Sequence, residues 1–142
     1  MTVALLDVNV LLALFDPDHL DHERAHAWAQ TGLADGWATC AITQNGLVRI
    51  LSQPTYPNPL TVPAAMETLL AATTDPRHEY WACGLSLVGG AIETSRLLGP
   101  RQVTDTYLLA LAVAQDGSFV TFDGRIDPAI VHGATPDHLV VL

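Results

Sequence analysis

Lysine is absent from this sequence of 142 residues, and its six basic residues are all arginine. The absence excludes a P-loop nucleotide-binding site, whose lysine contacts the phosphates. It also excludes enzymes that form a Schiff base through a lysine amine. No G-x-G-x-x-G segment follows a predicted strand, so dinucleotide binding has no support either.

Cysteine is scarce, and long apolar runs are missing. The two cysteines, Cys40 and Cys83, form no metal-type pair, and reduced thiols in the cytoplasm are the simplest interpretation. No apolar run reaches the roughly 18 residues that a membrane helix needs. The first apolar stretch is interrupted by Asp7 and Asn9 and has no basic start, so it does not resemble a signal peptide. We therefore expect a cytoplasmic protein with no membrane segment.

Charge is also sparse and unbalanced. Charged residues make up 15% of the chain, and fifteen acidic against six basic residues give a net charge of −9. An acidic chain lacks the basic surface of a simple nucleic-acid binder, so a metal or a partner would have to offset repulsion from an anionic substrate. Hydrophobic residues reach 49% and the mean hydropathy is +0.28. This composition leaves apolar surface uncovered, which indicates an oligomer or partner interface.

The length predicts one domain spanning residues 1–142. Continuous apolar runs predict buried strands, and apolar residues at helical spacing predict the helices between them. Strands that alternate with helices imply an α/β fold with a mostly parallel central sheet of four to five strands. Asn9, Thr43 and Thr61 are expected helix caps. The expected strands are residues 3–7, 37–42, 78–83, 118–122 and 138–142, and the expected helices are residues 9–15, 18–32, 43–51, 61–70, a segment after Gly89-Gly90 that ends at Leu98, and 104–115.

Three aspartates occupy related positions in this pattern. Asp7 ends the first expected strand, Asp123 follows the strand 118–122, and Asp105 lies in the first turn of the helix 104–115. Carboxyl ends of parallel strands and the starts of the helices that follow them lie at one edge of a sheet, where open α/β folds bind ligands. Each aspartate alone could equally be a turn residue or a helix-terminus charge. Together they predict three carboxylates at one sheet edge.

Three neighbouring carboxylates cannot all stay ionised unaided, because their mutual repulsion raises their pKa values. A divalent cation removes this repulsion. Oxygen ligands without histidine or cysteine favour Mg²⁺ or Mn²⁺, and the usual substrate of such a site is a phosphate ester. The metal also activates an attacking water and screens an acidic protein from an anionic substrate. The pattern therefore indicates metal-assisted phosphoryl chemistry.

Four segments together resemble a PIN domain, and more narrowly the VapC-type toxins of VapBC toxin–antitoxin pairs. They are Leu5-Leu6-Asp7-Val8-Asn9, Thr104-Asp105-Thr106-Tyr107, Thr121-Phe122-Asp123-Gly124-Arg125, and the central run from Ile42 to Ser52. The likeness spans the whole chain in order and spacing. It implies a three-layer α/β/α fold and an endoribonuclease dependent on Mg²⁺, with Mn²⁺ as the alternative. It also implies a homodimer that cleaves RNA and is inhibited by a cognate VapB-type antitoxin in a larger hetero-oligomer.

The resemblance also assigns roles to individual residues. It makes Asp7, Asp105 and Asp123 the metal ligands, with metal-bound water as the nucleophile. It makes Asn9 and Thr121 groups that orient a carboxylate or a water.

Two arginines keep open alternatives. Arg125 would contact phosphate or pair with an acidic neighbour, and these two alternatives weigh equally. Arg49 could steer RNA or bond to the antitoxin, although a solvated or ion-paired arginine is the simpler interpretation.

The sequence departs from the PIN pattern at one site position. PIN domains usually carry a glutamate at the start of the third helix, and the aligned residue here is Gln44, followed by Asn45. Gln44 keeps the size and an acceptor oxygen but loses the charge, so it stays a candidate catalytic residue. The alternative function is a catalytically weakened PIN domain that acts mainly as an antitoxin- or RNA-binding module. Asp127 is a candidate replacement for the missing acid, or a cap of the segment at Pro128.

Two further interpretations have weaker support. A phosphatase with an aspartyl nucleophile needs a second acid two residues after the first, where this chain has Asn9, and usually a lysine. His19, His22 and His26 share one helical face and could bind zinc, but polar residues on a surface helix explain them better because no fourth ligand is near.

Overall fold

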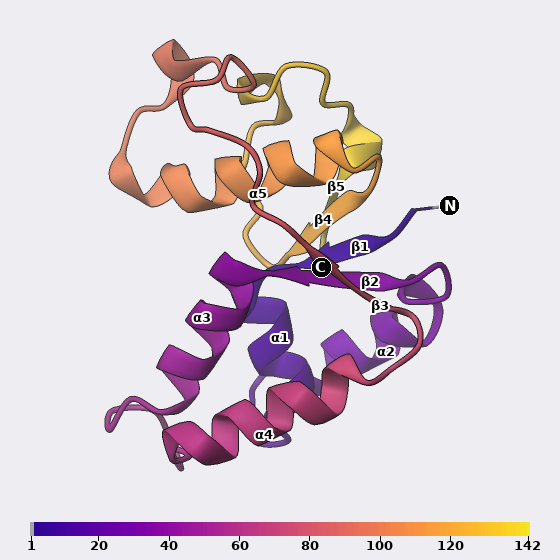
Figure 1. Cartoon of the computed structure of the whole chain (residues 1–142), viewed down its shortest axis with the longest axis vertical. Coiled ribbons are helices and arrows are strands. Elements are labelled where there is room, and N and C mark those ends of the chain that lie inside the picture. The colour runs from indigo at the N-terminus through magenta and orange to yellow at the C-terminus, as the bar shows by residue number, and fades with distance from the viewer. Residues whose placement is uncertain (1) are drawn as a thin grey trace.

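A five-stranded, all-parallel sheet forms the centre of the protein (Figure 1). The structure is a computed structural model that describes residues 2–142. The strand order is β3-β2-β1-β4-β5, so the first strand lies in the middle and the chain moves outward on both sides of it. The strands are β1 (Ala4–Leu6), β2 (Trp37–Cys40), β3 (His78–Trp81), β4 (Ser118–Thr121) and β5 (Leu139–Val141).

Helices cover both faces of this sheet. Figure 1 shows helices α1 to α4 below the sheet, and α5 above it together with the long segment that follows β3. This arrangement confirms the three-layer α/β/α architecture. The helices are α1 (Val8–Phe15), α2 (His22–Gly32), α3 (Ala41–Leu51), α4 (Val62–Thr73) and α5 (Val103–Ala114).

The strands are buried on both faces, which explains their continuous apolar runs. Ala4 and Leu6 of β1 pack into the core between the sheet and helices α1, α3 and α4. Leu5 packs into the core between the sheet and α5. Phe119 and Val120 of β4 alternate in the same way. Neighbouring side chains of a strand point to opposite faces, so each central strand supplies both cores.

The helix α5 is nearly apolar around its whole circumference, as expected for a helix buried between the sheet and a covering segment. All residues from Thr106 to Ala112 are buried. Its start is nevertheless exposed at the carboxyl edge of the sheet, because Thr104 stands in solvent and Asp105 is half-buried. The burial of α5 therefore fixes the position of its first turn.

Two of the three expected helix caps are wrong. The helix α1 begins at Val8, because the Asp7 carboxylate accepts a hydrogen bond from the Val8 backbone and caps it; Asn9 is left for another role. The helix α3 begins at Ala41, so Thr43 lies inside its first turn. Thr61 caps α4 as predicted, accepting from the Ala64 backbone at 3.2 Å.

The helix expected to end at Leu98 is also wrong. Only a short 3₁₀ turn, Thr94–Arg96, forms there. Ile92 is buried and makes an antiparallel bridge with Val131, and the Glu93 backbone donates to the Ile130 carbonyl at 2.7 Å. An eight-residue helix is marginal on its own, so this long-range pairing prevails over local helical spacing.

The histidines of α2 have a structural role. His22 Nδ1 lies 2.7 Å from the carbonyl oxygen of Ala13, and His26 Nε2 lies 3.1 Å from that of Leu14. These carbonyls belong to the last turn of α1, where a helix leaves its acceptors free. The two imidazoles therefore join α2 to the end of α1.

In residues 2–142, no helix combines the length and apolar character that crossing a membrane requires.

Gly117 marks a close approach between the end of α5 and the sheet. A Cβ atom at this position would lie 2.6 Å from the Val3 carbonyl oxygen and 2.6 Å from the Trp81 ring. We expect Gly117→Ala to destabilise the fold by about 1–3 kcal/mol, because backbone and a packed ring must both shift. Calorimetry should then show a melting temperature several degrees lower.

Gly99→Ala is the matched control. Its added Cβ meets nothing within 4 Å, and its extended backbone suits any residue. The melting temperature should stay close to that of the wild type. Equal melting temperatures for the two variants would contradict the packing described around Gly117.

Candidate active site at the carboxyl edge of the sheet

Asp7 is held in place where β1 becomes α1. Its backbone N–H donates to the Val120 carbonyl at 2.9 Å, which continues the pairing of β1 with β4. One carboxylate oxygen accepts from the Val8 backbone at 2.7 Å, and the other accepts from the Thr121 hydroxyl at 2.6 Å. The residue is buried, with 7% of its surface exposed. Strand register and helix capping together orient this carboxylate.

Thr121 and Asn9 connect Asp7 to the segment after β4. The Asn9 amide donates to the Thr121 hydroxyl oxygen at 3.2 Å and accepts from the Phe122 backbone at 3.3 Å. The Thr121 hydroxyl oxygen also accepts from the Asp123 backbone at 3.1 Å. Residues far apart in the sequence thus form one hydrogen-bonded network. Thr121 and Asn9 therefore occupy positions suited to orienting Asp7 and Asp123.

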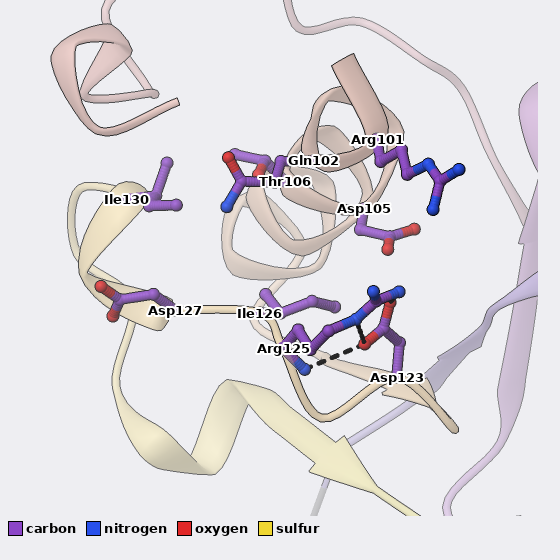
Figure 2. Close-up of a pocket in the computed structure, with 9 residues that line it drawn as sticks. All are labelled: Arg101, Gln102, Asp105, Thr106, Asp123, Arg125, Ile126, Asp127 and Ile130. Carbon is purple, nitrogen blue, oxygen red and sulfur yellow. Dashed lines mark hydrogen bonds and ion pairs between the residues drawn. The ribbon is translucent and has the colours of Figure 1, made fainter. Parts of the chain in front are cut away.

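Asp123 faces Arg125. The Arg125 backbone donates to one oxygen of Asp123 at 2.9 Å, and the guanidinium donates to both oxygens at 3.0 Å each (Figure 2). This fork-like contact holds the pKa of Asp123 below its usual range. Of the two alternatives for Arg125, the structure shows the ion pair with an acidic neighbour.

Asp105 projects from the first turn of α5 toward Asp123 (Figure 2). Burial, followed by the negative charges of Asp7 and Asp123, raises the pKa of Asp105 to about 6, although Arg125 opposes the shift. Burial also raises the pKa of Asp7, against the hydrogen bonds from Thr121 and Val8. The three predicted aspartates therefore share one electrostatic environment, in which negative charge accumulates.

A cavity of about 190 Å³ opens beside Asp105 and Asp123. Arg101 and Arg125 line it with them, and Asp127 lies at its far side (Figure 2). Asp127 caps a 3₁₀ turn, Pro128–Ile130, by accepting from the Ala129 backbone at 2.9 Å. It therefore has the capping role that was one of the two alternatives for this residue.

Asp7, Asp105 and Asp123 offer the type of ligand atom that a hard divalent cation prefers. These ligand atoms are carboxylate oxygens. Burial first, and the neighbouring carboxylates second, raise the pKa values of Asp7 and Asp105, and a bound cation would offset this penalty on their negative charge. Within residues 2–142, no three histidine, cysteine or acidic side chains are already gathered at ligand spacing. Both carboxylate oxygens of Asp123 accept hydrogen bonds from the Arg125 guanidinium instead.

Gln44 lies apart from this network. Its amide donates to the Thr39 hydroxyl oxygen at 3.0 Å, and Thr39 is also hydrogen-bonded to His78 at 2.8 Å. Gln44 lines a groove between α3 and α4, together with Met66 and Tyr80.

A neighbouring face of α3 lies beside Asp7. Asn45, Gly46 and Arg49 line a cavity of about 490 Å³ with Asp7 and Thr104. A Cβ at Gly46 would lie 2.7 Å from Val8, which shows how closely this face approaches the start of α1. The sequence interpretation missed Asn45, which its spacing of four residues from Arg49 would have placed on the same helix face.

Comparisons with known proteins identify the family of this chain. The PIN domain family matches residues 4–129. Ribonuclease VapC44 of Mycobacterium tuberculosis is 58% identical over 140 residues, which cover 98% of this chain and 99% of the relative. Ribonuclease VapC39 of the same organism is 42% identical over 125 residues, which cover 87% of this chain and 90% of the relative.

A solved structure shares the fold. The crystal structure of VapBC2 from Rickettsia felis bound to a DNA fragment from their promoter aligns with a TM-score of 0.61, over 99% of this chain and 97% of that one. At 14% sequence identity, this likeness supports the fold alone. The family match and the close relatives carry the assignment. The chain belongs to the PIN-domain family and, within it, to the VapC group.

Proposed function

We propose that this protein is a divalent-metal-dependent endoribonuclease that acts in the cytoplasm as the toxin of a VapBC-type pair. The observation that carries the proposal is the placement of Asp7, Asp105 and Asp123 at one edge of the sheet, where Thr121 links Asp7 to Asp123 and the charges of both act on Asp105. Carboxylates that share such a site are the ligands a hard cation requires. The 58% identity to Ribonuclease VapC44 supports RNA as the substrate.

The three aspartates would hold the cation, Mg²⁺ or Mn²⁺. When bound, the cation supplies a Lewis acid that activates water and offsets charge at the phosphorus. Thr121 and Asn9 keep Asp7 and the backbone of Asp123 in position through the hydrogen bonds described above.

Arg125 would exchange one anion for another during binding. Its guanidinium is exposed and paired with Asp123, and a phosphodiester offers it the same bidentate geometry as a carboxylate. Leaving Asp123 for the substrate phosphate would free both oxygens of Asp123 for the cation. Arg125 is therefore proposed as a phosphate-binding residue of the bound state.

An antitoxin and a second copy of the chain are the proposed protein partners. The solved neighbour is described as VapBC2 bound to a promoter fragment, which supports a VapB-type antitoxin in a larger assembly. Val62, Met66 and Leu70 of α4 and Tyr80 of β3 are exposed apolar side chains, as an interface would require.

The first prediction of this proposal concerns the metal ligands. Asp7→Asn and Asp105→Asn should each lower RNA cleavage by roughly 100-fold or more, since even residues that only support a metal ligand contribute about 10–100-fold. The assay is cleavage of a mixed RNA pool by antitoxin-free protein with Mg²⁺, with Mn²⁺ and with EDTA. Asp127→Asn is the matched control, because asparagine also caps a helix. Cleavage that persists in EDTA, or in both aspartate variants, would refute the proposal.

The second prediction concerns Thr121. Thr121→Val keeps the side-chain shape but removes the hydroxyl that donates to Asp7 and accepts from Asn9 and Asp123. We expect cleavage to fall by about 10–100-fold and the Mg²⁺ concentration for half-maximal rate to rise. Thr121→Ser restores the hydroxyl and should recover most of the rate. A serine variant as impaired as the valine variant would show that packing, rather than the hydroxyl, matters.

The third prediction separates the nuclease from the weakened binding module. Gln44 hydrogen-bonds Thr39 and lines the groove beside α4, so a carboxylate at this position would lie outside the hydrogen-bonded network of Asp7, Thr121 and Asp123. Gln44→Glu should change the cleavage rate by less than about fivefold, equivalent to about 1 kcal/mol. A much larger gain would indicate that Gln44 impairs the natural enzyme and would favour the binding module.

A further inference from the structure

In the part of the chain that the structure describes, two of the six arginines have no carboxylate partner. The other four pair with acidic side chains, at distances from 2.8 to 3.8 Å. Within residues 2–142, no such pair involves Arg49 or Arg101, although the chain carries fifteen acidic residues. The paired arginines and their partners are Arg24 with Asp21, Arg77 with Asp75, Arg96 with Asp127, and Arg125 with Asp123.

These two arginines flank the aspartates. Arg49 of α3 lines the cavity that contains Asp7 and Thr104. Arg101 lines the other cavity, with Asp105 and Asp123 (Figure 2). Thr104 and Asp105 are consecutive residues, so the first turn of α5 stands between the two cavities. Both arginine side chains are exposed to solvent.

The positions of Arg49 and Arg101 matter because the rest of the protein is acidic. A chain of net charge −9 repels a polyanion, and the aspartates add to that repulsion at the site itself. An arginine without a carboxylate partner keeps all its donors available for an external anion. Guanidinium groups bind phosphate oxygens bidentately, and phosphate contacts set the path of a nucleic acid over a protein.

We propose that Arg49 and Arg101 bind backbone phosphates on opposite sides of the phosphodiester bond that is cleaved. Single-stranded RNA would then cross the first turn of α5 from one cavity to the other, with its scissile phosphate at the aspartates. The inference rests on the proposed function, because it takes RNA as the substrate. A good substrate must extend by at least one phosphate on each side of the cut.

Salt dependence counts such contacts directly. Each phosphate contact with single-stranded nucleic acid adds about 0.7 to the slope of log affinity against log salt concentration. We expect Arg49→Gln and Arg101→Gln each to reduce that slope by about 0.7, and the double variant to reduce it by about 1.4. The probe is a fluorescein-labelled single-stranded RNA, followed by anisotropy over a KCl series in EDTA, which stops metal-dependent cleavage.

Arg77→Gln is the charge-matched control. It removes one positive charge, but Arg77 is paired with Asp75 and directly precedes β3. It therefore lies at the amino edge of the parallel sheet, opposite the aspartates. Its salt slope should equal that of the wild type.

The outcomes distinguish this inference from the proposed function. Wild-type cleavage with Mg²⁺, together with slopes for Arg49→Gln and Arg101→Gln equal to the Arg77→Gln slope, would overturn the inference and leave the nuclease intact. The expected slope changes without any cleavage under Mg²⁺ or Mn²⁺ would support the RNA path and overturn the nuclease. A folded wild-type protein that neither binds nor cleaves RNA would overturn both.

Discussion

The parallel pairing of β1 with β4 is the constraint on which the site depends. It sets Leu6 beside Val120, so that the next residues, Asp7 and Thr121, meet in a buried hydrogen bond of 2.6 Å. A buried carboxylate is expensive unless it is hydrogen-bonded, and here strand register supplies the donor. The same threonine accepts from the backbone of Asp123. The register of β1 and β4 therefore fixes the Asp7 carboxylate and the backbone of Asp123 at the same edge of the sheet.

The positive charge of Arg125 and the negative charges of the aspartates determine the electrostatics of the site. In the unliganded arrangement, Arg125 neutralises Asp123, while burial and neighbouring charge leave Asp105 with a pKa of about 6. The site thus combines a carboxylate that is paired with an arginine and two carboxylates whose negative charge burial disfavours. Arginine suits this place because its planar fork binds carboxylate and phosphate equally well. An acidic protein can handle a polyanion when its few cations stand at the point of contact.

The sequence predicted the sheet and the three aspartates because both follow from local patterns. Continuous apolar runs identify buried strands, and parallel topology brings Asp7, Asp105 and Asp123 to one edge. Side-chain direction was harder to predict. Successive residues of a helix point about 100° apart, so Gln44 turns to Thr39 while the next residue joins the cavity beside Asp7. The bridge between Ile92 and Val131 was hidden for another reason, since it joins residues distant in the sequence.

We propose that the three aspartates form one cation site. The most direct measurement is Mn²⁺ binding by electron paramagnetic resonance, as a function of pH, for the wild type and Asp105→Asn. Because the pKa of Asp105 is raised to about 6, protons compete with the cation, and wild-type affinity should weaken as the pH falls through that value. The variant should bind Mn²⁺ much more weakly at neutral pH. Equal affinities in the two proteins, with no change around pH 6, would contradict the account.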